Sequence, residues 1–285
     1  MTITITTSNV NGIRAAKRKG IEQWAAKNTP DVWCMQEVRA PQNEIDPIFD
    51  EFGFEYATAG RIADQSGLDR MNEICRIKGR AGVGLLSALP VIDKRYGLPG
   101  LAEDVDSGRW IEADVKTPQG YTVTVVCVYV HAGNTDDPEK MKQKYRFLDT
   151  MLVRMGQLRD EAAHGGKQAV LCGDFNIAHT PLDIKNAKAN EKHAGFLPEE
   201  RAYVDKWLGE LEFVDVMRSL CGDIQGPYTW WSQRGRAFDN NVGWRIDYQF
   251  ATPELAETAR GFVIDKAPTY DLRWSDHAPL SITYD

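Results

Sequence analysis

The sequence predicts an α/β fold in which two β-sheets pack face to face and helices lie on the outside. Short apolar segments with strand patterns recur along all 285 residues and alternate with helical segments. Some neighbouring strands are separated by a tight turn, such as PQG at 118–120, so antiparallel pairs are expected beside parallel ones. No linker rich in Gly, Ser or Pro interrupts the chain, so we expect a single domain over residues 1–285.

The N-terminal half is predicted to alternate between strands and helices. Apolar–polar alternation indicates strands, and an apolar stripe with Ile21 and Trp24 indicates a helix that Thr29-Pro30 ends. The predicted elements are a strand at Thr2–Thr7, a helix at Arg14–Asn28, a strand at Asp31–Gln36, a helix at Asn43–Phe52, and strands at Ala81–Ser87 and Val91–Gly97. The polar segment Arg61–Arg80 is predicted to be a long loop, and such loops are often functional or mobile.

The C-terminal half begins with a predicted hairpin and contains the longest helix. Asp136-Asp137-Pro138 marks the start of that helix, and Gly165-Gly166 marks its end. The predicted elements are strands at Arg109–Lys116 and Tyr121–Val130, a helix at Glu139–Ala163, a strand at Gln168–Cys172, a helix at Pro198–Leu211, and strands at Trp244–Ala251 and Leu280–Thr283.

The composition is that of an ordinary globular protein and disfavours several classes. The N-terminus lacks a basic segment followed by an apolar one, so no secretory signal is expected. No run of 18 apolar residues occurs, so no membrane span is expected and the cytoplasm is the expected compartment. The five cysteines include no CxxC pair, which disfavours a zinc site. Cys34, Cys127 and Cys172 lie in apolar runs and are expected to be reduced core residues.

The net charge of −7 argues mildly against nucleic-acid binding, because the phosphate backbone attracts cations. Local charge decides binding, however, and the basic residues form three clusters. These are Arg14, Lys17, Arg18 and Lys19; Arg70, Arg76, Lys78 and Arg80; and Lys140, Lys142, Lys144 and Arg146. For each cluster, a solvated surface is a more common explanation than a ligand contact.

Polar residues stand repeatedly at the ends of predicted strands, where active sites of such folds are assembled. They are Asn9 and Asn11, Gln36 and Glu37, Tyr129 and His131, Asp174 and Asn176, Asp247, and Asp276 and His277. Most have a simple structural alternative, as turn formers or solvated strand ends. Asp247 lies inside the apolar segment GWRIDYQF, so it would need a partner or a function. Their shared position at strand ends favours one common site.

These residue types suit the metal-assisted hydrolysis of a phosphodiester. Oxygen ligands such as the Glu37 carboxylate and the asparagine amides suit Mg²⁺ or Mn²⁺. Asp174 would orient or deprotonate the attacking water, and Asn176 would donate to the water or the phosphate. Asp247 would hold His277 in one tautomer and keep it charged, so that the imidazolium stabilises charge on the phosphate.

An ordered set of motifs resembles one family over nearly the whole chain. The motifs are SNVNGIRA at 8–15, MQEVR at 35–39, GVGLLS at 82–87, YVHAGN at 129–134, GDFNIAHTPLDIKNAKANEKHAGFLPEER at 173–201, NVGWRIDY at 241–248 and SDHAPL at 275–280. A lone GDxN or SDH is a weak signal, whereas the ordered set is specific. The chain resembles the exonuclease III and abasic-endonuclease branch of the endonuclease–exonuclease–phosphatase superfamily, which includes DNase I-like enzymes.

The resemblance implies a fold and a set of roles. The fold would be a four-layer α/β/β/α sandwich with two mixed sheets. The implied metal residues are Asn9, Glu37 and Asp276, with Mg²⁺ as the cofactor and Mn²⁺ able to substitute; the implied catalytic residues are Tyr129, Asp174, Asn176, Asp247 and His277. By this resemblance Tyr129 contacts the phosphate, and Asp247 and His277 form a carboxylate–imidazole pair. A monomer is the family expectation.

The segment after Asn176 resembles the DNA-repair members of the family. It carries Asn186 and Asn190 at positions that approach DNA, and Trp230, Trp244 and Ile246 match an apolar pocket for an extruded abasic sugar. Such a slot can exclude normal nucleotides by size, because an abasic deoxyribose lacks its base. Trp231 is expected to be a core residue instead.

The implied activity is Mg²⁺-dependent hydrolysis of the phosphodiester 5′ to abasic sites in double-stranded DNA. Exonuclease activity in the 3′→5′ direction and 3′-phosphatase activity at 3′ ends are expected beside it. Two alternatives remain open: a non-catalytic DNA-binding relative, and a phosphoesterase acting on a substrate other than DNA. The chain departs from the family pattern at Asn11, His131 and Arg61–Arg80, which bears on metal affinity and on the balance of activities.

Overall fold

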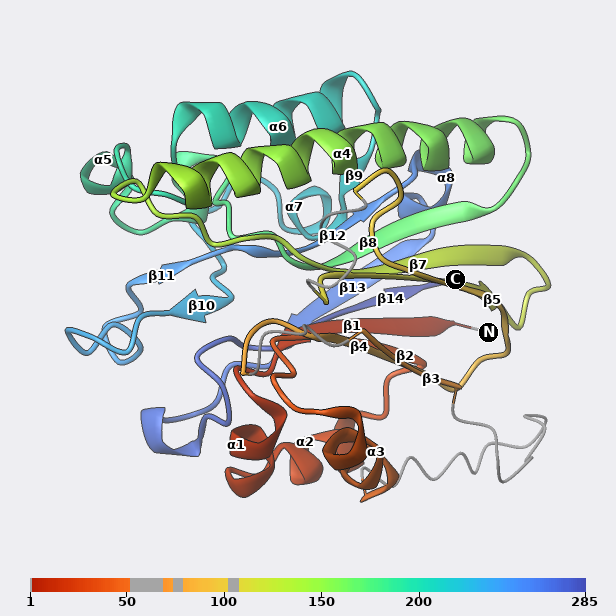
Figure 1. Ribbon diagram of the computed structural model, residues 1–285, viewed down its shortest axis with the longest axis horizontal. Helices are drawn as coiled ribbons and strands as arrows, with labels where there is room; N and C mark the ends of the chain where they lie inside the picture. The colour runs from red at the N-terminus through yellow and green to blue at the C-terminus, as the bar shows by residue number, and fades with distance from the viewer. Residues whose placement is uncertain (1, 52–68, 74–78, 102–107) are drawn as a thin grey trace.

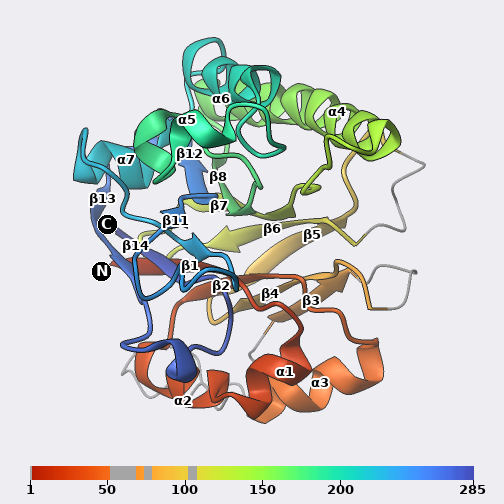
Figure 2. The same cartoon turned by 90° about the vertical axis from the view of Figure 1, so that its left-hand side faces the viewer.

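The computed structural model describes residues 2–51, 69–73, 79–101 and 108–285. Two six-stranded sheets lie face to face, and helices cover both outer faces (Figure 1 and Figure 2). The predicted four-layer α/β/β/α sandwich is therefore confirmed. In the part of the chain that the structure describes, no helix is both long and apolar enough to cross a lipid bilayer.

The first sheet takes its strands from both ends of the chain. Its order is β13-β14-β1-β2-β4-β3, with β1 (Ile3–Asn9), β2 (Val32–Gln36), β3 (Asp69–Glu73), β4 (Val83–Ser87), β13 (Ala259–Ile264) and β14 (Leu280–Tyr284). β1 and β2 run parallel, and Asn9 at the end of β1 lies opposite Gln36 at the end of β2. Residues that follow these two strands therefore emerge at the same edge of the sheet.

The second sheet is formed mainly by the middle of the chain. Its order is β5-β6-β7-β8-β12-β9, with β5 (Val91–Tyr96), β6 (Trp110–Lys116), β7 (Thr122–Tyr129), β8 (Gln168–Asp174), β9 (Val214–Asp215) and β12 (Asp247–Ala251). β7 runs parallel to β8, so Tyr129 lies opposite Asp174. β12 runs antiparallel to β8, so Asp247 also lies opposite Asp174. Three predicted site residues are thus brought into one row by strand register.

Helices cover the two sheets on opposite sides of the molecule. The first sheet is covered by α1 (Ile13–Arg18), α2 (Ile21–Asn28) and α3 (Gln42–Glu51), and the second by α4 (Pro138–Ala163) and α6 (Pro198–Gly209) (Figure 1). α7 (Val216–Cys221) packs at the edge of the sandwich, against β12 of the second sheet and β13 of the first. α4 begins at Asp137, whose side chain accepts a hydrogen bond from the backbone nitrogen of Lys140, and Pro138 suits the first helical position. The shorter elements are α5 (Ala187–Asn190), α8 (Pro253–Ala256), β10 (Trp230–Trp231), β11 (Gly243–Trp244) and the 3-10 helices at Pro181–Asp183 and Tyr270–Leu272.

Aliphatic side chains fill the space between the sheets. Cys34, Cys127 and Cys172 are buried there as free thiols, which confirms their expected place in the core. Gln249 on β12 donates from Nε2 to the carbonyl of Ile5 (2.8 Å), and its Oε1 accepts from the Tyr284 hydroxyl (2.9 Å). Because both partners belong to the first sheet, this buried amide ties the two sheets together.

The structure differs from the predicted elements at three places. The helix predicted at Arg14–Asn28 is two helices, because Gly20 has a φ of 94°, which an α-helix cannot contain. The strand predicted at Trp244–Ala251 is interrupted, since β11 pairs with β10 whereas β12 pairs with β8. The loop predicted at Arg61–Arg80 contains β3, which pairs with β4. Residues 61–68 and 74–78 of that segment lie outside the described residues.

Candidate active site

Most of the predicted site residues line one cavity at the end of the sandwich that carries β10, β11 and α5 (left in Figure 1, facing the viewer in Figure 2). The cavity encloses about 420 Å³. Its polar lining includes Glu37, Tyr129, Asp174, Asn176, Asp276 and His277. Trp230, Trp244 and Ile246 form an apolar part of the wall, and Asn190 lies at the rim. We call Trp230, Trp244 and Ile246 the apolar wall.

Three predicted residues do not line the cavity directly. Asn9 and Asp247 are fully buried and contact side chains that do line it. Asn186 is exposed and precedes α5. Its carbonyl accepts a hydrogen bond from Nδ2 of Asn190 (2.8 Å), so it reaches the cavity only through Asn190.

His277 lies between two carboxylates. Its Nδ1 is 2.9 Å from Oδ2 of Asp247, and its Nε2 is 3.8 Å from Oδ2 of Asp174. Burial alone would lower the pKa of His277, but the negative charges of Asp247 and Asp174 raise it to about 9. The imidazole is therefore a cation at neutral pH. The imidazole ring is held in one orientation, because its partner Asp247 lies in β12 and is fully buried.

Asp174 is surrounded by hydrogen-bond donors. Its Oδ2 accepts from Nδ2 of Asn9 (2.9 Å) and of Asn176 (3.3 Å), and its Oδ1 accepts from the backbone nitrogen of Asn176 (2.9 Å). Burial and the nearby charge of Asp247 raise the pKa of Asp174 to about 7, although His277 opposes the shift. A carboxyl group with this pKa can both accept and release a proton near neutral pH.

Glu37 forms a second polar corner of the cavity. Its Oε1 accepts from Nδ2 of Asn9 (3.0 Å) and from the Tyr129 hydroxyl (2.6 Å). Its Oε2 is paired with the guanidinium of Arg39 and accepts no hydrogen bond within the described part of the chain. Burial and the charge of Asp174 raise the pKa of Tyr129 to about 12, so its hydroxyl stays protonated and acts as a donor.

Asp276 is linked to Glu37 through the side chains of Asn11 and Arg39. Its Oδ1 accepts from Nδ2 of Asn11 (2.8 Å), and Oδ1 of Asn11 accepts from Arg39 (2.9 Å). Its Oδ2 accepts from Nε1 of Trp230 (3.2 Å). Glu37 and Asp276 are thus connected through Asn11 and Arg39 instead of touching each other.

The cavity offers the oxygen-rich donors that a hard divalent cation requires. Among the described residues, Asp174, Asp247 and His277 have potential ligand atoms that all lie within 4.8 Å of one another. A protonated imidazole has no lone pair for a metal, however, so this trio is better explained as an imidazolium between two carboxylates than as a metal site. Glu37 fits a cation better, because among the described residues its Oε2 is paired only with the partly exposed side chain of Arg39 and accepts no hydrogen bond. The residues present therefore fit a cation at Glu37.

Aromatic contacts join the apolar wall to the polar residues. The rings of Trp230 and Trp244 meet edge to face with centroids 6.0 Å apart. Trp230 also lies beside His277, with centroids 6.4 Å apart. Trp231 points the other way and is only 2% exposed, packed against Phe238, which confirms its expected place in the core.

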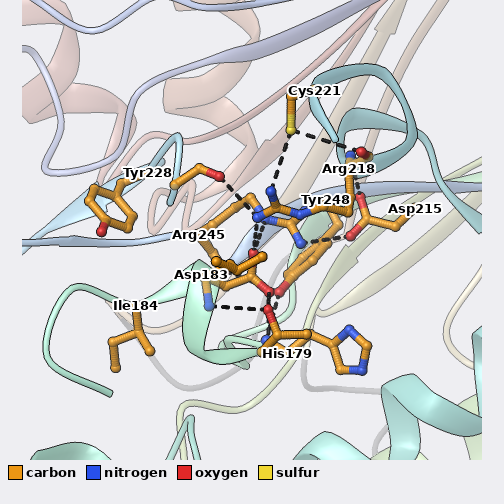
Figure 3. Close-up of polar contacts among 12 residues, drawn as sticks. His179, Asp183, Ile184, Asp215, Arg218, Cys221, Tyr228, Arg245 and Tyr248 are labelled. Carbon is orange, nitrogen blue, oxygen red and sulfur yellow. Dashed lines mark hydrogen bonds and ion pairs between the residues drawn. The ribbon is translucent and has the colours of Figure 1, made fainter. Parts of the chain in front are cut away.

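A buried cluster of charged groups surrounds Arg245, a neighbour in the chain of two residues of the apolar wall (Figure 3). Arg245 is fully buried and lies between Trp244 and Ile246 in the chain. Its Nε donates to Asp183 (2.7 Å), and its two terminal nitrogens donate to the two carboxylate oxygens of Asp215 (2.9 and 2.7 Å). Its backbone nitrogen donates to the carbonyl of Asp183 (2.7 Å). The backbone that carries the wall is therefore anchored to two other segments of the chain.

Four residues of the site and its support were not predicted from the sequence: Arg39, His193, Gly195 and Arg245. Arg245 carries the same signal as Asp247, a charged residue within an apolar segment, and could have been found by it. Gly195 has a φ of 92°, and a Cβ there would lie 3.0 Å from Cζ3 of Trp244, so the chain needs glycine at this point of the cavity. Nothing in the local sequence marks Arg39 or His193 as lining residues.

Comparisons with known proteins find relatives along nearly the whole chain. Residues 6–277 match the model of the endonuclease/exonuclease/phosphatase family. The chain is 30% identical over 275 residues to an exodeoxyribonuclease of Bacillus subtilis, with 96% of each chain covered. It also resembles the solved structure of an AP endonuclease from Archaeoglobus fulgidus, with 30% identity, a TM-score of 0.81 and 99% of each chain covered. A 3′ phosphatase from Neisseria, solved with a product DNA hairpin, gives 26% identity, a TM-score of 0.79 and 99% coverage of each chain.

Proposed function

Because the chain belongs to the endonuclease/exonuclease/phosphatase family, we propose that it is a DNA-repair nuclease. It hydrolyses the phosphodiester 5′ to abasic sites in double-stranded DNA and acts on 3′ ends as a 3′→5′ exonuclease and 3′-phosphatase. The relatives support each part of this activity: one is an exodeoxyribonuclease, one an AP endonuclease and one a 3′ phosphatase that binds DNA.

One observation carries the proposal. A carboxylate with a pKa of about 7, Asp174, lies 3.8 Å from an imidazolium, His277, in a cavity whose other wall is apolar. The first two groups suit phosphodiester hydrolysis by water, and the apolar wall suits a sugar that has lost its base. Neither part alone would distinguish a DNA-repair nuclease from another phosphoesterase.

The roles of the side chains follow from their surroundings. Asp174 accepts a proton from the attacking water, which its two asparagine neighbours and the buried setting prepare it to do. The water oxygen attacks phosphorus, the bond between phosphorus and the 3′ oxygen breaks, and the 3′ oxygen takes up a proton from solvent to leave as a hydroxyl. His277, kept charged by Asp247, donates to a phosphate oxygen and stabilises the negative charge that develops there. Tyr129 stays protonated and donates to Glu37 in this structure, and we assign its hydroxyl a contact to the same phosphate when substrate is bound.

Mg²⁺ is the proposed cofactor, held by Glu37 and Asp276 with Asn9 beside them, and Mn²⁺ is expected to substitute for it. When bound, it supplies positive charge next to the phosphate oxygens. Arg39 pairs with Glu37 and with Asn11, so this arginine must rearrange when Glu37 takes up a cation. Contacts to DNA are proposed for Asn186 and Asn190 at the rim, and for Trp230, Trp244 and Ile246 in the apolar wall.

A cleavage assay with three substrates tests the proposal. The substrates are a duplex with one abasic analogue, an undamaged duplex with a recessed 3′ end, and a duplex with a 3′-phosphate. Nicking 5′ to the lesion in Mg²⁺ but not in EDTA is expected, together with trimming or dephosphorylation of the other two. Asp174→Asn should bind the abasic duplex like the wild type without cutting it. Binding without cleavage by the wild type under any divalent cation would overturn the enzymatic assignment.

A further inference from the structure

We propose that Lys144 and Glu200 form a positioning pair that holds Asn176 and two parts of the cavity lining in place for catalysis. The inference rests on the proposed nuclease function, because it assigns these residues a role in the same site. Lys144 lies on α4 and Glu200 on α6, and both side chains are fully buried. Neither residue lines the cavity, so neither can contact the substrate.

Lys144 does not belong to the basic surface cluster in which its sequence position placed it. Residues 141, 144, 148, 151 and 155 of α4 are buried and follow helical spacing, so Lys144 faces inward with the apolar side of the helix. Three oxygens surround its ammonium group: Oε1 of Glu200 (2.6 Å), the carbonyl of Asn176 (2.9 Å) and the carbonyl of Ala132 (3.2 Å). The interpretation of Lys144 as part of a DNA-facing or solvated cluster is therefore wrong.

Glu200 links the ion pair to the part of the cavity lining that lies beside Trp244. Its Oε2 accepts from the backbone nitrogens of Gly195 (2.6 Å) and Leu197 (3.0 Å). Gly195 lines the cavity directly beside Trp244. One buried pair thus binds the segment after β7, the segment after β8 and the turn that leads into α6.

The backbone conformation of Asn176 depends on its surroundings. Its φ of 50° lies in the left-handed region, which asparagine adopts more readily than most side chains but less readily than the right-handed region. Its side chain donates to Oδ2 of Asp174 and to the carbonyl of Val130 (3.0 Å), so the position of the amide depends on this backbone conformation. The ammonium of Lys144 binds the carbonyl of Asn176 and so stabilises the conformation that directs the amide toward Asp174.

Stability alone does not explain a buried ion pair at this place. Replacing such a pair by neutral side chains of similar size is often neutral or stabilising, because removing two charges from water is costly. Three of the four backbone groups that this pair binds belong to the cavity-lining residues Ala132, Asn176 and Gly195, and the fourth belongs to Leu197, two residues after Gly195. The role of the pair is therefore to position Asn176 and Gly195 and not chiefly to stabilise the fold.

Charge-neutral double variants test the proposal. Lys144→Met with Glu200→Gln removes the ammonium without leaving a lone buried charge. Lys144→Gln with Glu200→Gln keeps an amide donor on the side of the Asn176 carbonyl, on a side chain one bond shorter than lysine. We expect the first variant to lower kcat on the abasic duplex about 100-fold with little change in KM, the scale for displacing a catalytic group by about 1 Å. The second should recover part of that loss.

A second buried ion pair on the same helix provides the matched control. Arg154 on α4 is paired with Glu112 (2.7 Å) and contacts no residue that lines the cavity in the described part of the chain. Arg154→Met with Glu112→Gln should lower the denaturant midpoint but leave kcat near that of the wild type. Denaturant unfolding of all variants shows that each is folded under assay conditions; if the methionine variant is not, the glutamine variant and Glu200→Gln alone carry the comparison.

The outcomes separate this inference from the proposed function. If the wild type cuts the abasic duplex and the folded Lys144 variants keep kcat within about threefold, the positioning role is wrong and the nuclease assignment stands. Equal losses of kcat in the Lys144 and Arg154 pairs would also overturn it, because a general loss of packing would then suffice. If the wild type itself does not cut, the proposed function fails and the inference fails with it.

Discussion

Nδ1 of His277 lies 2.9 Å from Oδ2 of Asp247, a carboxylate that is fully buried in β12. The second oxygen of Asp247, Oδ1, has no hydrogen-bond partner among the described residues, so in this part of the chain the imidazole is the side chain that binds the carboxylate. Such an arrangement fixes the tautomer of the ring and favours its charged form. The pair joins β12 of the second sheet to the segment before β14 of the first, so the site depends on the packing of both sheets.

The pH profile should report this pair. The kcat/KM of the wild type should rise through about pH 7, as Asp174 loses its proton, and fall above about pH 9, as His277 loses its own. In Asp247→Asn the charge that raises the pKa of His277 is gone, so the alkaline limb should move to lower pH by about 1 unit or more. The measurement is initial-rate cleavage of the abasic duplex at saturating Mg²⁺. An alkaline limb that stays in place would show that Asp247 does not control the charge of His277.

Trp244→Ala should separate the two DNA activities. The variant opens the apolar wall that receives the sugar, so cleavage at an abasic analogue should fall about tenfold or more, while trimming of a recessed 3′ end falls less. The ratio of the two rates in one preparation is the measurement. Trp207→Phe, at a buried tryptophan outside the cavity, serves as the control and should leave the ratio unchanged. Equal losses of both activities in Trp244→Ala would contradict the pocket assignment.

Arg245→Met should destabilise the fold. The change leaves Asp215 and Asp183 buried without the guanidinium that pairs with both, although Arg218 still reaches Asp183. Removing one partner from a buried charge cluster costs about 3–5 kcal/mol, which denaturant unfolding can measure. Adding Asp215→Asn to the variant should restore part of the loss, because one unpaired charge is then removed. A free energy of unfolding equal to that of the wild type would mean that the cluster does not support the wall.

Glu37→Gln should weaken the response to metal. Loss of the carboxylate charge should raise the Mg²⁺ concentration needed for half-maximal cleavage by about tenfold or more. A metal titration of cleavage rate is the measurement. Glu44→Gln changes a carboxylate on α3 that pairs with Arg14 outside the cavity, and should not alter the titration. A Glu37→Gln variant with an unchanged metal requirement would rule out Glu37 as the metal-binding residue.

Local sequence patterns were enough to predict many helices and strands. They failed where a contact with a distant part of the chain determines the backbone conformation. The predicted strand at Gln168–Cys172 and helix at Glu139–Ala163 are present within two residues of their observed ends. The predicted strand at Trp244–Ala251 is broken, because Arg245 turns toward Asp183 and Asp215 from other parts of the chain. β13 was not predicted, since its residues are half-exposed at the sheet edge and carry little alternation. That residues 1–285 form one domain and act as a monomer remains a prediction.

The sequence by itself determined the residue types of the site, their order and the family that they resemble. Motifs such as GDFN and SDHAPL are local, so they can be read without knowing how the chain folds. Only the tertiary structure decided that Asp174 lies opposite Asp247, and that Lys144 faces Asn176 instead of solvent. It also decided the pKa values of Asp174 and His277. Charge interactions and burial depend on distances through space. Asp174 and Asp247 are 73 residues apart in the chain and come close together only because β8 and β12 pair in the folded sheet.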